Sequence, residues 1–444
     1  MKSPIKPLVA TFAMTCSLSG YASETANQPE AALTTYATIA AANYQDAVTD
    51  AKTLQTAIHS LVSKPSADTL QAAKDAWLAS RESYGTTEIF RLANGPIDAE
   101  GGWVAKSYGG LEGQINAWPL DENLIDYTED ANYQRTQGNI IDTKGIFSPG
   151  GEEARPVDVS RITPTVLSEL NENGGDANVA TGYHALEFLL WGQDQDYNNM
   201  IEDKITHGAL SAGQRPLSDF TTDPLAQRRL DYLSSVTEKL VNDLSMVSSA
   251  WNANVKGNDG LYRAALLNEL TGAQQDKNIP VSQSLKVIFA GMGVFSKSEL
   301  ANERIAVAVL TPSEEDEHSC FSDNTHRDIA LNYQGFKNVL LGEYKGKKVG
   351  PAFFDKVPAE EQAKIKKLMA EIEKRITTIN ELATTTMHFD YQIHPENEDS
   401  VQNIVSLKNE LRRLGDQMVV VAKAYGISLT TNDVTDPEET QVGG

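Results

Sequence analysis

Apolar residues recur in this chain at steps of three and four along almost its whole length, and alternation at every second residue is nearly absent. The clearest stripes run from Leu33 to Leu61, from Ile365 to Leu382 and from Ile404 to Val421. Such steps place side chains on one face of an α-helix. The pattern therefore predicts an all-α fold, built as two helical bundles in series.

The first 22 residues have the pattern of a secretory signal peptide. A short basic start precedes the apolar stretch 7–18, and small residues lead up to an expected cleavage site near Ala22. The residues before Cys16 make a poor lipidation motif, so we expect no lipid anchor there. No other stretch has the roughly 18–20 apolar residues that a membrane helix needs. The mature protein is therefore predicted to be periplasmic, if the source is Gram-negative, with no membrane insertion.

Composition shifts divide the mature chain. A polar break at residues 252–259 separates an N-terminal helical half, residues 30–255, from a C-terminal helical half, residues 256–429. Inside the first half, residues 98–160 are rich in glycine and follow no period, which predicts an ordered insertion with short helices. Residues 430–444 are acidic and polar, and we expect a flexible tail there.

The charge balance favours cationic ligands. The chain has 61 acidic and 38 basic residues, a formal net charge of −23. Such a surface repels nucleic acid and anionic lipid and attracts metal ions or basic peptides. After signal cleavage Cys320 is the only cysteine, so no internal disulfide is possible.

Charged residues stand on one of the apolar stripes. Leu70, Ala73 and Trp77 lead into Arg81, Tyr84 and Glu88 at helical steps, and the pattern predicts a helix that continues to the Asn94-Gly95-Pro96 stop. Charges on a core-facing stripe are costly unless they are paired or coordinated. Two interpretations remain open: the side chains extend from the stripe edge to water, or they line a polar cavity within the bundle.

A histidine and a glutamate lie three residues apart in a very apolar run. His184 and Glu187 are neighbours if residues 175–192 form one helix, and Trp191 shares their face. Gly182 is unfavourable inside a helix, at about 1 kcal/mol relative to alanine, unless another backbone or a ligand comes close. The pair could be a buried hydrogen bond or half of a divalent-cation site of the kind found in helical bundles.

A third cluster spans residues 314–328. It contains His318, Cys320, Asp323 and His326 among several carboxylates. It could be a solvated acidic loop that ends in an Asp323 helix cap, or it could supply further ligands. The remaining histidines lack partners at ligand spacing, and we expect them on the surface or in loops: His59, His207, His388 and His394.

Several long segments resemble the imelysin-like family, which includes insulin-cleaving metalloproteases and iron-regulated proteins of bacterial envelopes. The resemblance rests on residues 182–192, which fit a Gly-x-His-x-x-Glu signature, and on Trp77, Arg81, Tyr84 and Glu88. It also rests on Gly95-Pro96-Ile97-Asp98, on Trp118-Pro119-Leu120-Asp121 and on residues 316–326.

The resemblance implies two helical-bundle-like halves with the functional site in a cleft between them. His184 and Glu187 would be metal ligands, and no catalytic residue is assigned. The positions expected to line or support the cleft are Gly182, Trp77, Arg81, Tyr84, Glu88, Trp191, Glu303, Arg304, His318, Cys320, Asp323 and His326.

Two functions from different classes follow. The first is a periplasmic protein of the iron-regulated type that binds a divalent or ferric ion, with iron favoured and zinc possible, and serves iron acquisition. The alternative is a zinc-dependent endopeptidase of the insulin-cleaving type, for which His184 and Glu187 give an incomplete ligand set. A third candidate is a module that binds haem or a peptide in the cleft. The expected partner is thus a metal ion or small ligand, or a peptide, and not nucleic acid.

Overall fold

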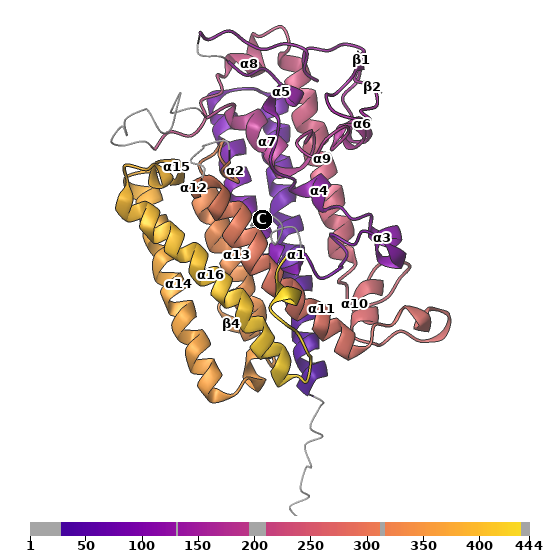
Figure 1. Ribbon diagram of the computed structural model, residues 1–444. Coiled ribbons are helices and arrows are strands. Elements are labelled where there is room, and N and C mark those ends of the chain that lie inside the picture. The colour runs from indigo at the N-terminus through magenta and orange to yellow at the C-terminus, as the bar shows by residue number, and fades with distance from the viewer. Residues whose placement is uncertain (1–27, 130–131, 195–209, 311–315, 437–444) are drawn as a thin grey trace, which may run out of the picture.

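The chain folds almost entirely into helices (Figure 1). The computed structural model describes residues 28–129, 132–194, 210–310 and 316–436. Within these ranges the strands form only two short antiparallel hairpins, which pair β1 (Ile146–Phe147) with β2 (Val157–Asp158) and β3 (Glu343–Tyr344) with β4 (Lys347–Lys348). The all-α prediction is confirmed.

The first half is organised around one long helix. α1 (Gln28–Ser63) packs against α2 (Ala67–Tyr84) and α9 (Ala226–Ser249), and α7 (Gly182–Trp191) lies against both α9 and α2. The Leu33–Leu61 stripe predicted from the sequence faces this core, since Leu33, Leu54 and Leu61 are fully buried.

Short elements fill the rest of the first half. Residues 98–160 hold α3 (Gly102–Tyr108), α4 (Glu112–Ile115), α5 (Glu122–Ile125), β1 and β2. They are followed by α6 (Pro164–Leu170) and α8 (Ser218–Thr221). The next short elements, α10 (Leu261–Leu266) and the 3₁₀ turn η2 (Gly272–Lys277), already lie in the second half.

A long helix of the second half changes from α-helical to π-helical hydrogen bonding and back. α11 (Val281–Val294) continues into a π-helix, η3 (Phe295–Ala306), and then into α12 (Val307–Leu310). Around it stand α13 (Thr325–Leu341), α14 (Ala359–Thr385), α15 (Phe389–Ile393) and α16 (Glu398–Ala424), with the 3₁₀ turns η4 (Phe353–Lys356) and η5 (Asn432–Val434). α16 packs against α14, α11 and η3, which completes this bundle.

The two halves share their interior. α13 contacts α2 and the 3₁₀ turn η1 (Glu88–Phe90), and α1 contacts α11 and α13. One continuous cluster of buried apolar side chains runs through both halves. In Figure 1, α13 lies beside α2 and α1 near the middle of the molecule, and the site described below lies at this junction.

The helix predicted through Glu88 ends earlier, at Tyr84. A Cβ on Gly85 would lie 2.9 Å from the Leu331 Cβ, so α13 crosses the chain at this point. The Asn332 amide donates to the Gly85 carbonyl at 3.0 Å. Tertiary contacts with α13 therefore end α2, and Glu88 lies in η1 instead of α2.

α7 begins at Gly182, and the earlier start predicted near residue 176 is wrong. Gly182 has φ +83°, and a Cβ there would lie 2.4 Å from the Ile115 carbonyl oxygen. The glycine is thus required by a close backbone approach, one of the two reasons expected from the sequence.

Two further expectations concern the signal peptide at the N-terminus and the flexible tail at the C-terminus. Residues 1–22, the predicted signal peptide, lie outside the described ranges. The tail expected from residue 430 is not free along its first part, because Val434 is fully buried and Lys297 donates to the Thr435 hydroxyl at 2.5 Å. None of the described helices is both long enough and apolar enough to cross a membrane.

Candidate functional site

Arg81 on α2 lies completely buried where the two halves meet. Its guanidinium contacts Asp328 on α13 at 2.8 Å and also donates to the Asn116 side-chain oxygen. The rings of Tyr84 and Tyr183 lie 5.3 and 5.0 Å from it. The charged stripe of α2 therefore points into the protein and not toward water.

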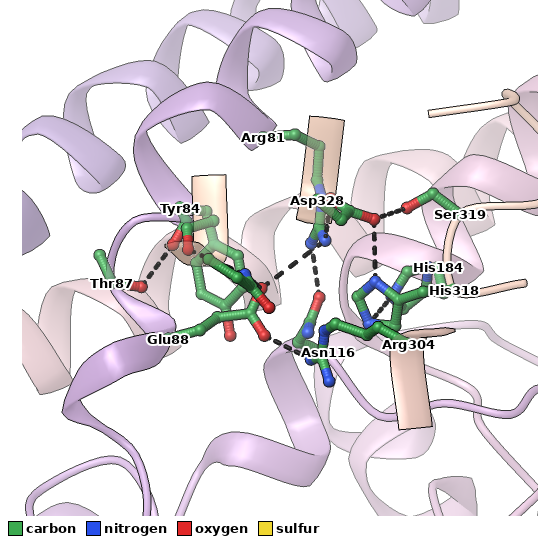
Figure 2. A network of polar contacts seen from close by, with 12 residues as sticks. Arg81, Tyr84, Thr87, Glu88, Asn116, His184, Arg304, His318, Ser319 and Asp328 are labelled. Carbon is green, nitrogen blue, oxygen red and sulfur yellow. Dashed lines mark hydrogen bonds and ion pairs between the residues drawn. The ribbon is translucent and has the colours of Figure 1, made fainter. Parts of the chain in front are cut away.

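Two histidines from opposite halves meet next to this ion pair. His184 on α7 and His318, which precedes α13, lie with their Nε2 atoms 3.3 Å apart. His318 Nδ1 lies 2.8 Å from Asp328, which also accepts a hydrogen bond from Ser319. Figure 2 shows this chain of contacts running from Arg81 through Asp328 and His318 to His184.

Glu187 holds the other side of His184. Its Oε2 lies 2.9 Å from His184 Nδ1, as the three-residue spacing predicts. Its Oε1 accepts hydrogen bonds from the Ser322 amide at 3.0 Å and the Ser322 hydroxyl at 2.7 Å. Both carboxyl oxygens are thus engaged, so Glu187 orients His184 in this structure instead of presenting a free ligand atom.

Burial determines the charge of both imidazoles. It lowers the pKa of His184 well below 6.5, and His318 lowers this pKa further; burial also lowers the pKa of His318. Burial alone would raise the pKa of Asp328, but Arg81 and His318 outweigh burial and keep that pKa well below 3.8. Burial raises the pKa of Glu187 to about 8. Two neutral imidazoles therefore face each other between an anionic Asp328 and a Glu187 that can hold a proton.

Such a pair can hold either a proton or a cation between its rings. With one Nε2 protonated, the two rings share a hydrogen bond. With each Nδ1–H donated to its carboxylate, both Nε2 atoms present lone pairs to the same point, which is the arrangement of metal-binding histidines held by carboxylates.

A second set of buried ion pairs lies beside the first. Glu88 contacts Arg304 of η3 and accepts from the Asn332 amide at 3.2 Å. Arg304 and Arg91 both reach Glu299, at 2.7 and 2.9 Å. The π-helix therefore supplies a cation and an anion to the junction, and π-helical turns are frequent at functional sites.

A small pocket leads from the surface to His318. Its volume is about 130 Å³, and both halves line it, with Glu112 and Trp118 on one side and Glu299 and Arg304 on the other. Glu303 is exposed at its edge. Of the two histidines, His318 lines this pocket and His184 does not.

Several residues important here were not among the expected site residues: Arg91, Glu112, Asn116, Trp118, Glu299, Ser322 and Asp328. The Trp118 ring packs 5.0 Å from the His184 ring. Trp118 lies in a segment that carries the family resemblance, and Asp328 lies in the acidic cluster, so the sequence pointed to both regions. It did not show which side chains Trp118 and Asp328 would contact.

The other residues expected to line or support the site do not contact the histidine pair directly. Trp77 donates to the Tyr183 carbonyl at 2.9 Å, and Trp191 packs 5.4 Å from the Trp77 ring. Cys320 is buried, which raises the pKa of its thiol. The His326 Nδ1 atom lies 3.0 Å from the carbonyl oxygen of Asp323, away from the histidine pair.

The structure rejects one of the two interpretations of the acidic cluster, and it gives His388 a partner and buries His394, although both lie outside the helices, as expected. The segment after residue 316 is not a solvated loop, since His318 and Asp323 are buried, and the N-cap of α13 is Asn324 instead of Asp323. His388 contacts Asp323, and His394 is buried, because the connection between α14 and α16 folds onto the protein. His59 is exposed as expected, and His207 lies outside the described residues.

The family model for Imelysin (Peptidase M75) matches residues 40–418. The chain belongs to the imelysin family. The match covers both halves and includes every candidate ligand described above.

The fold is also that of a solved relative. The crystal structure of an iron-regulated protein A precursor from Parabacteroides distasonis is similar, with a TM-score of 0.59 over 91% of this chain and 97% of that chain. The two sequences are only 16% identical, so this similarity shows the shared fold alone. No curated protein sequence matches the chain.

Proposed function

We propose that this imelysin-family protein binds a metal ion, with iron favoured, between His184 and His318, and that it serves iron acquisition in the periplasm. The observation that carries the proposal is the 3.3 Å separation of the two Nε2 atoms. Two imidazole nitrogens about 2.0–2.1 Å from one ion at a tetrahedral angle are themselves about 3.3–3.4 Å apart. The pair thus already has the spacing of two ligands on one ion.

The charge around the pair supports a cation. The junction holds three guanidinium groups, Arg81, Arg91 and Arg304, and five carboxyl groups, Glu88, Glu112, Glu187, Glu299 and Asp328. With both imidazoles neutral, the excess is one negative charge while Glu187 holds its proton and two once Glu187 releases it. A divalent ion would neutralise it, and buried charge is costly when it is not compensated.

The pocket favours an ion over a larger ligand. Its volume of about 130 Å³ is below the roughly 300 Å³ of the smallest ordinary small-molecule sites. An ion with bound water fits such a space better than haem or a peptide does. Imidazole and oxygen donors suit iron, and the acidic residues at the pocket mouth favour cation capture.

The endopeptidase alternative fits the geometry less well. A zinc peptidase needs three protein ligands, an open position and a carboxylate that is free to act as a base. Glu187 is the nearest carboxylate to His184, and its two oxygens are bound to His184 and Ser322. No further observation favours peptide cleavage.

The test is titration calorimetry of the chelator-treated protein with ferrous iron under anaerobic conditions, ferric iron and zinc. We expect His184→Gln and His318→Gln each to remove one binding event. Glu187→Gln should retain it with an affinity about 10–100-fold lower, since Glu187 orients a ligand.

His59→Gln is the matched control, because His59 is exposed and far from the junction in sequence. Circular dichroism verifies that each variant is folded. Unchanged binding of all three ions by both junction variants would refute the proposal. Cleavage of insulin chains that a chelator stops, and that His184→Gln loses, would favour the endopeptidase instead.

A further inference from the structure

A second group of potential ligands lies where the α14–α16 connection meets the segment before α13. Asp323, His388 and Asp390 each offer one ligand atom, and these atoms all lie within 4.8 Å of one another. Asp323 belongs to the acidic cluster of residues 314–328, whereas His388 is the N-cap of the short helix α15 and Asp390 lies in its first turn. Asp323 lies more than 60 positions before His388 and Asp390 in the sequence.

The group is buried, and its members contact one another. Asp323 and Asp390 are each 4% exposed. Asp323 Oδ2 pairs directly with His388 Nδ1. The Asp194 side chain also lies within hydrogen-bonding reach of Asp323.

The electrostatics of this group favour a bound cation. Two buried carboxyl groups and the nearby Asp194 gather around a single imidazole. Burial raises the pKa of Asp323 even though His388 acts in the opposite direction. Like charges at such short range are costly in a low-dielectric interior unless a positive charge lies between them.

We propose that Asp323, His388 and Asp390 form a second metal site, which takes a divalent transition-metal cation through one imidazole nitrogen and two carboxylate oxygens. Mixed nitrogen and oxygen donors suit Mn²⁺, Fe²⁺ and Zn²⁺ better than Mg²⁺ or Ca²⁺. His388 is half-buried, so the site borders solvent, and water can complete the coordination.

The position of the site gives it a structural role. Asp323 follows Ser322, whose amide and hydroxyl hold Glu187, and the same segment carries His318. A cation bound to Asp323, His388 and Asp390 would fasten this segment to α15. It thereby stabilises the segment that supplies His318 to the histidine pair, through residues that the pair does not use.

The experiment uses the full chain stripped of metal, with Mn²⁺ as the probe. Free Mn²⁺ is counted by electron paramagnetic resonance, and Zn²⁺ is then added as a competitor. We expect the wild type to bind Mn²⁺ at this site and Zn²⁺ to displace it. His388→Gln and Asp390→Asn should each lose one equivalent, or bind it at least tenfold more weakly.

Matched controls are His59→Gln and Asp231→Asn, which replace exposed residues of the same types. A second measurement guards against misfolded variants: Mn²⁺ should raise the melting temperature of the wild type and of both controls, but not that of His388→Gln or Asp390→Asn. His184→Gln should keep this Mn²⁺ equivalent, which separates the site from the proposed histidine pair.

Three results would overturn the proposal. One is a wild type that binds neither Mn²⁺ nor Zn²⁺. Another is Mn²⁺ binding by His388→Gln and Asp390→Asn with the stoichiometry and affinity of the wild type. The third is a single equivalent that only His184→Gln and His318→Gln remove, which would support the proposed function while rejecting this second site.

Discussion

At the scale of single residues, Arg81 illustrates how a helical bundle accommodates a charge. The side chain is 0% exposed, its charge is matched by Asp328 at 2.8 Å, and aromatic rings surround the rest of it. A buried ion pair of this kind contributes little when complete, but its loss is costly when one partner remains. Arg81 is therefore tolerated because Asp328 comes from the other half.

Arg81→Met should destabilise the protein by about 3–5 kcal/mol, since it leaves the Asp328 carboxylate buried without its guanidinium. The measurement is chemical denaturation at pH 7, followed by circular dichroism. The matched control is Arg327→Met. Arg327 pairs with Glu82 at 2.7 Å, but the two side chains are 34% and 47% exposed, so this loss should stay below about 1 kcal/mol. Equal losses in the two variants would contradict our account of the buried pair.

At the scale of elements, the sequence predicted the long helices better than their ends. α14 and α16 follow their apolar stripes, because each stripe alone specifies one buried helical face. The end of α2 and the start of α7 were misplaced, since Leu331 and Ile115 of other segments determine them. The π-helix η3 could not be foreseen either, because its sequence keeps an ordinary helical composition.

Ion pairs also fasten the irregular region to a long helix. Asp126 directly follows α5 and is 1% exposed. It contacts Arg229 of α9 and Arg215, both at 2.7 Å. Burial alone would raise the pKa of Asp126, but the two arginines outweigh burial and hold the pKa below 3.8.

Asp126→Asn should cost about 2–4 kcal/mol at pH 7, because the amide has no charge and only one acceptor oxygen, whereas both carboxylate oxygens of Asp126 accept from arginines. A carboxyl group whose pKa is lowered by folding stabilises the protein above the ordinary value and loses this contribution as the pH falls through the folded value. The difference between wild type and variant should therefore be constant near neutrality and shrink below pH 3.8. Denaturation curves at a series of pH values measure it. Asp231→Asn, at an exposed position of α9, is the control and should show neither effect.

At the scale of the whole molecule, the junction is part of the core. One apolar cluster spans both halves, and each half supplies the counter-charges of the other, as in Arg81 with Asp328 and Glu88 with Arg304. A half that unfolded alone would leave these charges buried and unpaired, or would expose apolar surface. The halves should therefore stabilise each other.

We expect thermal unfolding in one cooperative transition. All five tryptophans lie between residues 77 and 251, so their fluorescence reports on the first half, whereas far-ultraviolet circular dichroism reports on helices of both. The two signals should change with the same midpoint. Two separate midpoints would show that the halves are independent domains. Arg81→Met should lower both midpoints together.

The sequence by itself determined the helical architecture and the neighbouring positions of His184 and Glu187. Both follow from the 3.6-residue period, which acts over a few residues and is therefore readable in one segment. The resemblance of several segments to a known family added the expectation that the two halves meet at the functional site.

Only the tertiary structure decided which partners these residues meet. His184 faces His318, 134 positions away, and Arg81 pairs with Asp328, 247 positions away. No local pattern encodes such pairings, because they result from how two helical faces pack and which charges become buried together. The same packing brought His388, expected on the surface or in a loop and without a partner, into contact with Asp323, and so it created both candidate metal sites.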